Sequence, residues 1–204
     1  MAFDLMGNAH CAWPLLRDAT RHGSLMYSFG IGEDISFDLA AIARYSCLVH
    51  GFDPTPRSIA WLSGQDTPPG FHFHPVGIGD RDDQVTFFPP ANSEFVSYSA
   101  EKAGGPDDAA AVKADVRRLQ SLVAMLATPT PDILKMDIEG YEYRVIDDII
   151  AGPIRPAQLL VEFHHGNYNI AADQTRLAVA KLQANNYKIF YVSADGRDYG
   201  FALV

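Results

Sequence analysis

A glycine turn followed by two acids is the first segment of this sequence whose residue types suggest chemistry. The apolar run at residues 25–29 leads into Gly30-Ile-Gly32, and Glu33 and Asp34 follow directly. A dinucleotide-binding turn would read Gly-x-Gly-x-x-Gly, but Ile35 stands where its third glycine belongs. Carboxylates at the start of a helix would also repel the pyrophosphate that such a turn attracts. The turn is therefore either a plain strand-to-helix connection or a site for a ligand with positive charge.

S-adenosylmethionine is a ligand of that kind, since it carries a sulfonium, an ammonium and an adenosine part. Glu33 or Asp34 would favour its positive end, and Gly30 and Gly32 would let the backbone approach it. Asp53 follows Gly30 at about the 20-residue spacing at which an acid binds a ribose hydroxyl. Asp53 also precedes a proline, however, and so suits the first position of a type I turn. Both interpretations of Asp53 stay open at this point.

Three side chains near two later apolar runs could handle the proton that an alcohol loses when it accepts a methyl group. Asp137 ends one run, and Glu162 and His164 end the next. We expect His164 to be the general base, because an imidazole can titrate near neutral pH, with Asp137 or Glu162 orienting it or the acceptor. The same groups could instead bind a divalent ion such as Mg²⁺. The metal-free route is favoured and no metal site is predicted, because the sequence shows no tight ligand spacing.

Apolar runs that alternate with helix-like segments must position these side chains. Repeated strand–helix alternation predicts an α/β fold with a doubly wound, mostly parallel sheet. Ligands bind beyond the carboxyl ends of the strands in such sheets. Predicted strands cover residues 25–29, 47–53, 71–76, 83–88, 112–116, 133–137, 159–163, 187–192 and 199–204, and predicted helices cover residues 36–45, 57–62, 119–126, 141–150 and 171–185.

Two longer strings resemble one known family. Residues 28–38 read Ser-Phe-Gly-Ile-Gly-Glu-Asp-Ile-Ser-Phe-Asp, and residues 134–142 read Leu-Lys-Met-Asp-Ile-Glu-Gly-Tyr-Glu. Both are similar to strings of the FkbM-type family of S-adenosylmethionine-dependent methyltransferases. Residues 52–56 and 92–99 also resemble one branch of that family. The resemblance spans residues 8–204.

The resemblance implies a class I methyltransferase fold, which is a Rossmann-like, seven-stranded sheet whose last strand is antiparallel. It also implies S-adenosylmethionine as the cofactor. One departure is that Ser28 replaces the leading acid of the general methyltransferase glycine motif and Asp34 replaces its third glycine. The methionine end of the cofactor would then be held differently from the commoner pattern. The expected cofactor-binding residues are Phe29, Gly30, Gly32, Glu33, Asp34, Asp53, Pro54, Gly77, Ile78 and Asp137.

Composition restricts the partners and the compartment. The chain has 204 residues and a formal net charge of −9, which argues against sequence-independent binding of nucleic acid by a basic surface. Its two cysteines, Cys11 and Cys47, show no metal or redox spacing and indicate a reducing compartment. No basic segment with a long apolar run opens the chain, and no run reaches membrane-spanning length. We therefore expect a cytoplasmic protein with no membrane partner, whose oligomeric state the composition does not determine.

The predicted function is S-adenosylmethionine-dependent methyl transfer to an oxygen of a small-molecule or sugar-like acceptor. We expect one domain over residues 1–204, in which an N-terminal segment (1–24) and a long loop (89–111) close the substrate pocket. The first alternative is a NAD-dependent oxidoreductase, which Ile35 and the carboxylates of the turn disfavour. The second alternative is a non-catalytic binding module that keeps the methyltransferase fold.

Overall fold

The computed structural model describes residues 1–89, 98–99 and 111–204. Most of the loop predicted at 89–111 therefore lies outside the described residues, and its part in closing a pocket stays a prediction. Within the described ranges, no helix is both long enough and apolar enough to cross a membrane.

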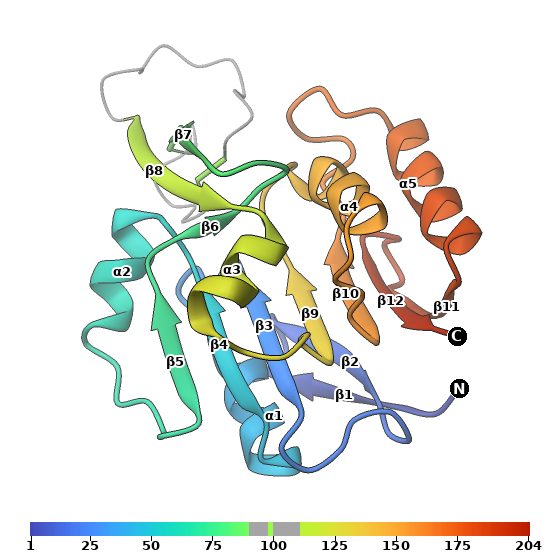
Figure 1. Cartoon of the computed structure of the whole chain (residues 1–204), viewed down its shortest axis with the longest axis horizontal. Coiled ribbons are helices and arrows are strands. Elements are labelled where there is room, and N and C mark those ends of the chain that lie inside the picture. The colour runs from blue at the N-terminus through green and yellow to red at the C-terminus, as the bar shows by residue number, and fades with distance from the viewer. Residues whose placement is uncertain (90–97, 100–110) are drawn as a thin grey trace.

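A seven-stranded sheet forms the centre of the described chain (Figure 1). Strand β12 runs antiparallel to its neighbours β10 and β11, and the pairs from β10 to β5 are parallel. The predicted α/β sheet with an antiparallel last strand is thus confirmed. In spatial order the strands are β11 (Tyr187–Val192), β12 (Asp198–Leu203), β10 (Gln158–Glu162), β9 (Ile133–Met136), β3 (Leu25–Phe29), β4 (Leu48–Phe52) and β5 (Phe71–His74).

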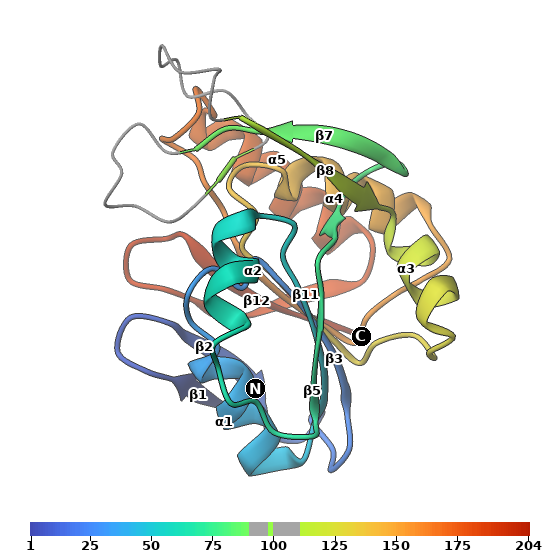
Figure 2. The same cartoon turned by 90° about the vertical axis from the view of Figure 1, so that its left-hand side faces the viewer.

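Helices cover both faces of this sheet. Figure 2 shows α1 (Ser36–Tyr45) and α2 (Pro56–Leu62) on one side of the strands. The other side carries α3 (Leu119–Leu126), α4 (Glu142–Ala151) and α5 (Ala172–Ala184). The bounds differ from the predicted ones by at most one residue, because the apolar periodicity and the helix-ending residues are local signals.

Two apolar cores lie against the two faces of the sheet, and alternation along the strands builds both. In β3, Tyr27 and Phe29 belong to the core beneath α3, α4 and α5, whereas Met26 belongs to the core beneath α1 and α2. Successive side chains of a strand point to opposite faces, so an all-apolar strand supplies both cores. Strand β10 repeats this pattern with Leu159 on the first side and Leu160 on the second.

Two smaller sheets differ from the sequence-based expectation. The N-terminal segment forms an antiparallel hairpin of β1 (Phe3–Gly7) and β2 (Ala12–Leu16), whereas the sequence predicted a cap without strands. A second sheet joins β6 (Gly77–Ile78), β8 (Val112–Arg117) and β7 (Asp83–Phe87). The strand predicted at 71–76 ends at His74, and the following residues leave the main sheet to pair with β8.

Candidate cofactor and catalytic site

A cavity of about 290 Å³ lies where the carboxyl ends of β3, β4 and β9 meet. All ten residues expected to bind the cofactor line it, together with parts of the N-terminal hairpin and the second sheet. Its lining combines partly exposed apolar residues, such as Phe87 and Ile138, with five acids. The other lining residues used below are His10, Cys11, Phe29, Gly30, Gly32, Glu33, Asp34, Asp53, Pro54, Gly77, Ile78, Lys135, Asp137 and Glu139.

The glycine turn needs both of its glycines. Gly30 has φ 78° and Gly32 has φ 56°, a left-handed conformation that residues with a Cβ rarely adopt. A Cβ on Gly30 would lie 1.7 Å from the backbone oxygen of Asp137. The sequence suggested that the glycines make room for a ligand. In the structure, Gly30 is required first by the close approach of the β3 turn to the end of β9.

The two acids of the turn differ in how their charge is balanced. Arg57 on α2 donates to the Glu33 carboxylate at 2.8 Å, so that charge is already paired. Asp34 accepts hydrogen bonds from the backbone N–H of Ser36 at 2.7 Å and from the side-chain amide of Asn8 at 2.5 Å. Partial burial acts to raise the pKa of Asp34, but these hydrogen bonds lower it. Among the described residues, no cation donates a hydrogen bond to Asp34, so its charge is not paired as that of Glu33 is.

Asp53 is buried at the end of β4 with both oxygens engaged. One oxygen accepts from the backbone N–H of Gly32 at 3.0 Å, and the other accepts from the N–H and hydroxyl of Thr55 at 2.9 and 2.7 Å. The turn interpretation of Asp53 is thus correct as far as it goes. A carboxylate offers about four lone-pair directions, so one remains for a ligand in the cavity. The two interpretations are compatible.

Lys135 supplies the buried positive charge beneath the turn. Its ammonium donates to the backbone oxygens of Gly30 at 2.7 Å and Phe29 at 3.3 Å, and it lies 3.8 Å from the Asp137 carboxylate. Burial alone would lower the pKa of Lys135, but Asp137 and other acids raise it. The charged lysine holds the backbone oxygens at the end of β3 and partly offsets the negative charge of the acids around the cavity.

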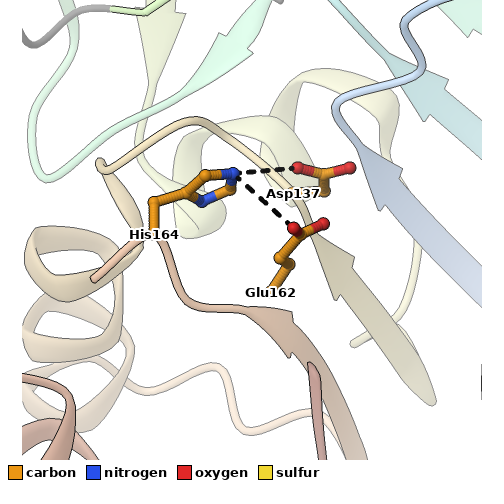
Figure 3. A group of neighbouring side chains, drawn as sticks. All are labelled: Asp137, Glu162 and His164. Carbon is orange, nitrogen blue, oxygen red and sulfur yellow. Dashed lines mark ion pairs between the residues drawn. The ribbon is translucent and has the colours of Figure 1, made fainter. Parts of the chain in front are cut away.

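His164 lies beside the cavity in a group of carboxylates (Figure 3). Its Nδ1 is 2.8 Å from Oε1 of the fully buried Glu142. Its Nε2 lies 3.3 Å from Glu139, 3.6 Å from Asp137 and 3.9 Å from Glu162. The pairing of β9 with β10 matches Met136 with Val161, so the next residues, Asp137 and Glu162, lie side by side.

The role of His164 as a metal-free general base stays a prediction, and its surroundings bear on the charge of the ring. Burial would lower the pKa of His164, but the hydrogen bond and charge of Glu142, with Asp137 and Glu139, raise it to about 10. These carboxylates favour the protonated imidazole as long as no other cation offsets their charge. Among the described residues, Asp137 and Glu139 line the cavity, whereas Glu162 and His164 do not. The catalytic roles of Asp137, Glu162 and His164 stay a proposal.

Several residues of the site were missed from the sequence. Glu139 and Glu142 lie in the 134–142 string without an assigned role, and Oε1 of Glu142 accepts from the backbone N–H groups of Ile138 and Gly140. The string that contains them was recognised, but their contact with His164 joins two strands that are distant in sequence. His10 and Cys11 enter the cavity wall through the hairpin, for which the sequence carried no strand signal.

The sequence match agrees with this architecture. The methyltransferase FkbM domain family matches residues 26–189, which include the glycine turn, Asp53 and the group around His164. The chain belongs to the FkbM methyltransferase family. This membership confirms the resemblance found in the two sequence strings.

Relatives of this FkbM domain are distant and longer. A probable methyltransferase-like protein 24 from Rattus norvegicus is 24% identical over 180 residues, which cover 83% of this chain and 43% of the relative. The Homo sapiens protein of the same name is 26% identical over 141 residues, which cover 68% of this chain and 32% of the relative. The chain thus spans less than half the length of the curated relatives it matches.

Two solved structures share the fold. The crystal structure of a methyltransferase FkbM from Methylobacillus flagellatus KT has a TM-score of 0.57 and 19% identity, covering 92% of this chain and 45% of that one. A Methanococcus jannaschii fibrillarin pre-rRNA processing protein has a TM-score of 0.53 and 9% identity, covering 91% of this chain and 68% of that one. At these identities the likeness establishes the fold alone.

Proposed function

We propose that this FkbM domain transfers a methyl group from S-adenosylmethionine to an oxygen of a small-molecule or sugar-like acceptor. The observation that carries the proposal is the convergence of all ten expected cofactor residues on one cavity at the carboxyl ends of the strands. Family membership supports the same reaction class. S-adenosylmethionine supplies an electrophilic methyl group on a sulfonium.

The donors and charges of the cavity suit this cofactor. The partly exposed Phe87 and Ile138 offer apolar surface for an adenine, and the remaining lone-pair direction of Asp53 suits a ribose hydroxyl. Asp34 keeps a negative charge for the ammonium or sulfonium, whereas the charge of Glu33 is paired with Arg57. The structure thus favours Asp34 over Glu33 for the positive end. A pyrophosphate would meet carboxylates instead of the bare amides that it needs.

Two carboxylates in the cavity wall suit a hydroxylated acceptor. Asp137 and Glu139 line the wall on the side of β9, where they can accept hydrogen bonds from hydroxyl groups. Holding an acceptor oxygen in line with the methyl group would supply much of the rate increase. The turn of the N-terminal hairpin, which brings His10 and Cys11 to the cavity, is proposed as part of the lid.

Calorimetry of the purified chain with S-adenosylhomocysteine and with NAD tests the cofactor. We expect one S-adenosylhomocysteine to bind per chain and NAD not to compete with it. Binding of NAD in preference would contradict the proposal and favour an oxidoreductase. A transfer assay with cofactor labelled on the methyl group, run on a panel of sugars and small alcohols, then tests the reaction. A chain that binds the cofactor but methylates none of them would favour the non-catalytic binding module.

Asp53→Asn tests the ribose contact. We expect the Kd for S-adenosylhomocysteine to rise about tenfold or more, because a hydrogen bond to a charged acceptor is lost. Thr55→Val is the matched control, since it removes one donor to Asp53 within the same turn but leaves the carboxylate in place. Equal losses of affinity in the two variants would mean that Asp53 only shapes the turn.

A further inference from the structure

We propose that Asp137, Glu162 and Nε2 of His164 form a binding site for a divalent cation. Each of these residues offers one donor atom, and the three atoms lie within 4.8 Å of one another. Figure 3 shows the three side chains converging from the ends of β9 and β10 and the segment after β10. Cation binding itself is independent of the proposed function, whereas the role of the cation in catalysis rests on it.

The spacing of the donors leaves room for an ion. Two donors that each lie about 2.1 Å from one cation are about 3.0 Å apart at right angles and about 4.2 Å apart across it. Nε2 of His164 is 3.6 Å from Asp137 and 3.9 Å from Glu162, which falls between these limits. Both separations are too long for a good hydrogen bond. The Glu139 carboxylate lies closer to Nε2, at 3.3 Å, and adds a further oxygen beside the same position.

The other ring nitrogen is held as in a metal-binding histidine. Nδ1 lies 2.8 Å from Oε1 of Glu142, which is itself fixed by two backbone N–H groups. A histidine that ligates a metal almost always donates its second N–H to a carboxylate or carbonyl, which fixes the ring orientation. Glu142 thus aims Nε2 at Asp137 and Glu162. The hydrogen bond between Glu142 and Nδ1 is the second observation that separates the group from an ordinary cluster of acids.

Charge also favours a cation at this point. Four carboxylates lie within 4 Å of the His164 ring nitrogens, those of Asp137, Glu139, Glu142 and Glu162. The positive charge of Lys135 lies nearby, but its ammonium contacts Asp137 and two backbone oxygens. Oxygen donors with one imidazole suit Mn²⁺ and related ions. We therefore choose Mn²⁺ as the probe.

The site adjoins the cavity through Asp137, which belongs to both. A cation there would bind the acceptor hydroxyl and make it more acidic. The O–H proton would pass to solvent water, and the oxygen lone pair would form the bond to the methyl carbon. The carbon–sulfur bond would break with its electron pair kept on sulfur, leaving S-adenosylhomocysteine. This methyl transfer consumes no oxidant or reductant.

Titration of the purified, metal-stripped chain with Mn²⁺, followed by electron paramagnetic resonance of the free ion, tests the site. We expect one Mn²⁺ per chain and at least a tenfold higher Kd in Glu162→Gln, which keeps the shape but loses the charge. Asp147→Asn is the control, because Asp147 is an exposed acid that pairs with Lys181 on the surface. Circular dichroism and S-adenosylhomocysteine binding report whether each variant is folded.

Two results would overturn the cation site. One is the absence of stoichiometric binding to a wild-type chain that still binds S-adenosylhomocysteine, in which case a protonated His164 occupies the place of the ion. The other is equal Mn²⁺ affinity in wild type and Glu162→Gln, which would mean scattered binding by surface acids. Either result leaves the proposed methyl transfer standing. A chain that binds Mn²⁺ but not S-adenosylhomocysteine would instead contradict the proposed function alone.

Discussion

Gly30 and Gly196 have similar backbone angles and different surroundings, which separates two costs of replacing a glycine. Gly30 has φ 78° and Gly196 has φ 74°. An added Cβ would meet the backbone oxygen of Asp137 at 1.7 Å in the first case and nothing within 4 Å in the second. The backbone strain is therefore shared, whereas the steric clash belongs to Gly30 alone.

Gly30→Ala should lower the free energy of unfolding by about 3 kcal/mol or more. Gly196→Ala should cost about 1 kcal/mol, the price of a left-handed alanine. Urea denaturation of both variants measures the difference, provided the slope of the transition is unchanged. Gly30→Ala should also bind S-adenosylhomocysteine more weakly, because the turn must move away from β9. Equal stability losses would mean that the turn relaxes around the added methyl group.

At the scale of the element, helix α1 begins with an acid that is buried. Asp38 lies in the first turn of α1 with 3% of its surface exposed, and its Oδ1 has no hydrogen-bond partner among the residues that the structure describes. Burial raises the pKa of Asp38 to about 6, against the attraction of Lys135. The raised pKa stabilises the fold fully below the unfolded value near 3.8, and this contribution is lost as the pH rises through 6. At pH 8 the helix therefore holds an ionised carboxylate at a cost.

Asp38→Asn should accordingly stabilise the protein more at pH 8 than at pH 5, by about 1–2 kcal/mol. Urea denaturation at the two pH values measures this difference. Asp173→Asn is the matched control, since Asp173 also lies in the first turn of a helix but has 85% of its side chain exposed. Asp173→Asn should change the free energy of unfolding by the same amount at both pH values. A variant that loses stability equally at pH 5 and pH 8 would contradict ionisation of Asp38 as the cause.

At the scale of the whole molecule, the sheet joins two cores into one folding unit. Leu159 and Leu160 are adjacent in β10 and fully buried, yet they belong to cores on opposite faces. Because both cores pack on the same strands, loss of either should destabilise the whole molecule. Leu159→Ala and Leu160→Ala should each cost about 2–5 kcal/mol and keep a single unfolding transition.

Leu177→Ala is the control for this pair, since Leu177 is 57% exposed on α5 and should change stability by less than about 0.5 kcal/mol. Within each of the three variants, the denaturation curves measured by fluorescence and by circular dichroism should coincide. Separate transitions in Leu159→Ala or Leu160→Ala would mean that the two faces unfold independently.

The sequence alone determined the order and type of most elements of the main sheet and ten of the residues that line the cavity. Hydrophobic periodicity and turn residues are local signals, and parallel strands place their carboxyl ends at one edge. Placing Gly30, Asp53 and Asp137 near one another therefore required no knowledge of side-chain contacts. The hairpin of β1 and β2 was not predicted, because Asp4 and Gly7 interrupt the apolar residues of β1 and Pro14 lies in the middle of β2.

Only the tertiary structure decided the chemistry around His164. The contacts of its ring with Glu139 and Glu142 depend on how the segments after β9 and β10 fold over each other. Sequence spacing cannot specify that arrangement, so from the sequence His164 was expected to titrate near neutral pH as an ordinary imidazole does. Likewise, the pairing of Glu33, in the turn before α1, with Arg57, in the first turn of α2, changes which acid of the turn keeps an unpaired charge. Ionisation depends on every charge and dipole within a few ångströms, and folding alone brings those groups together.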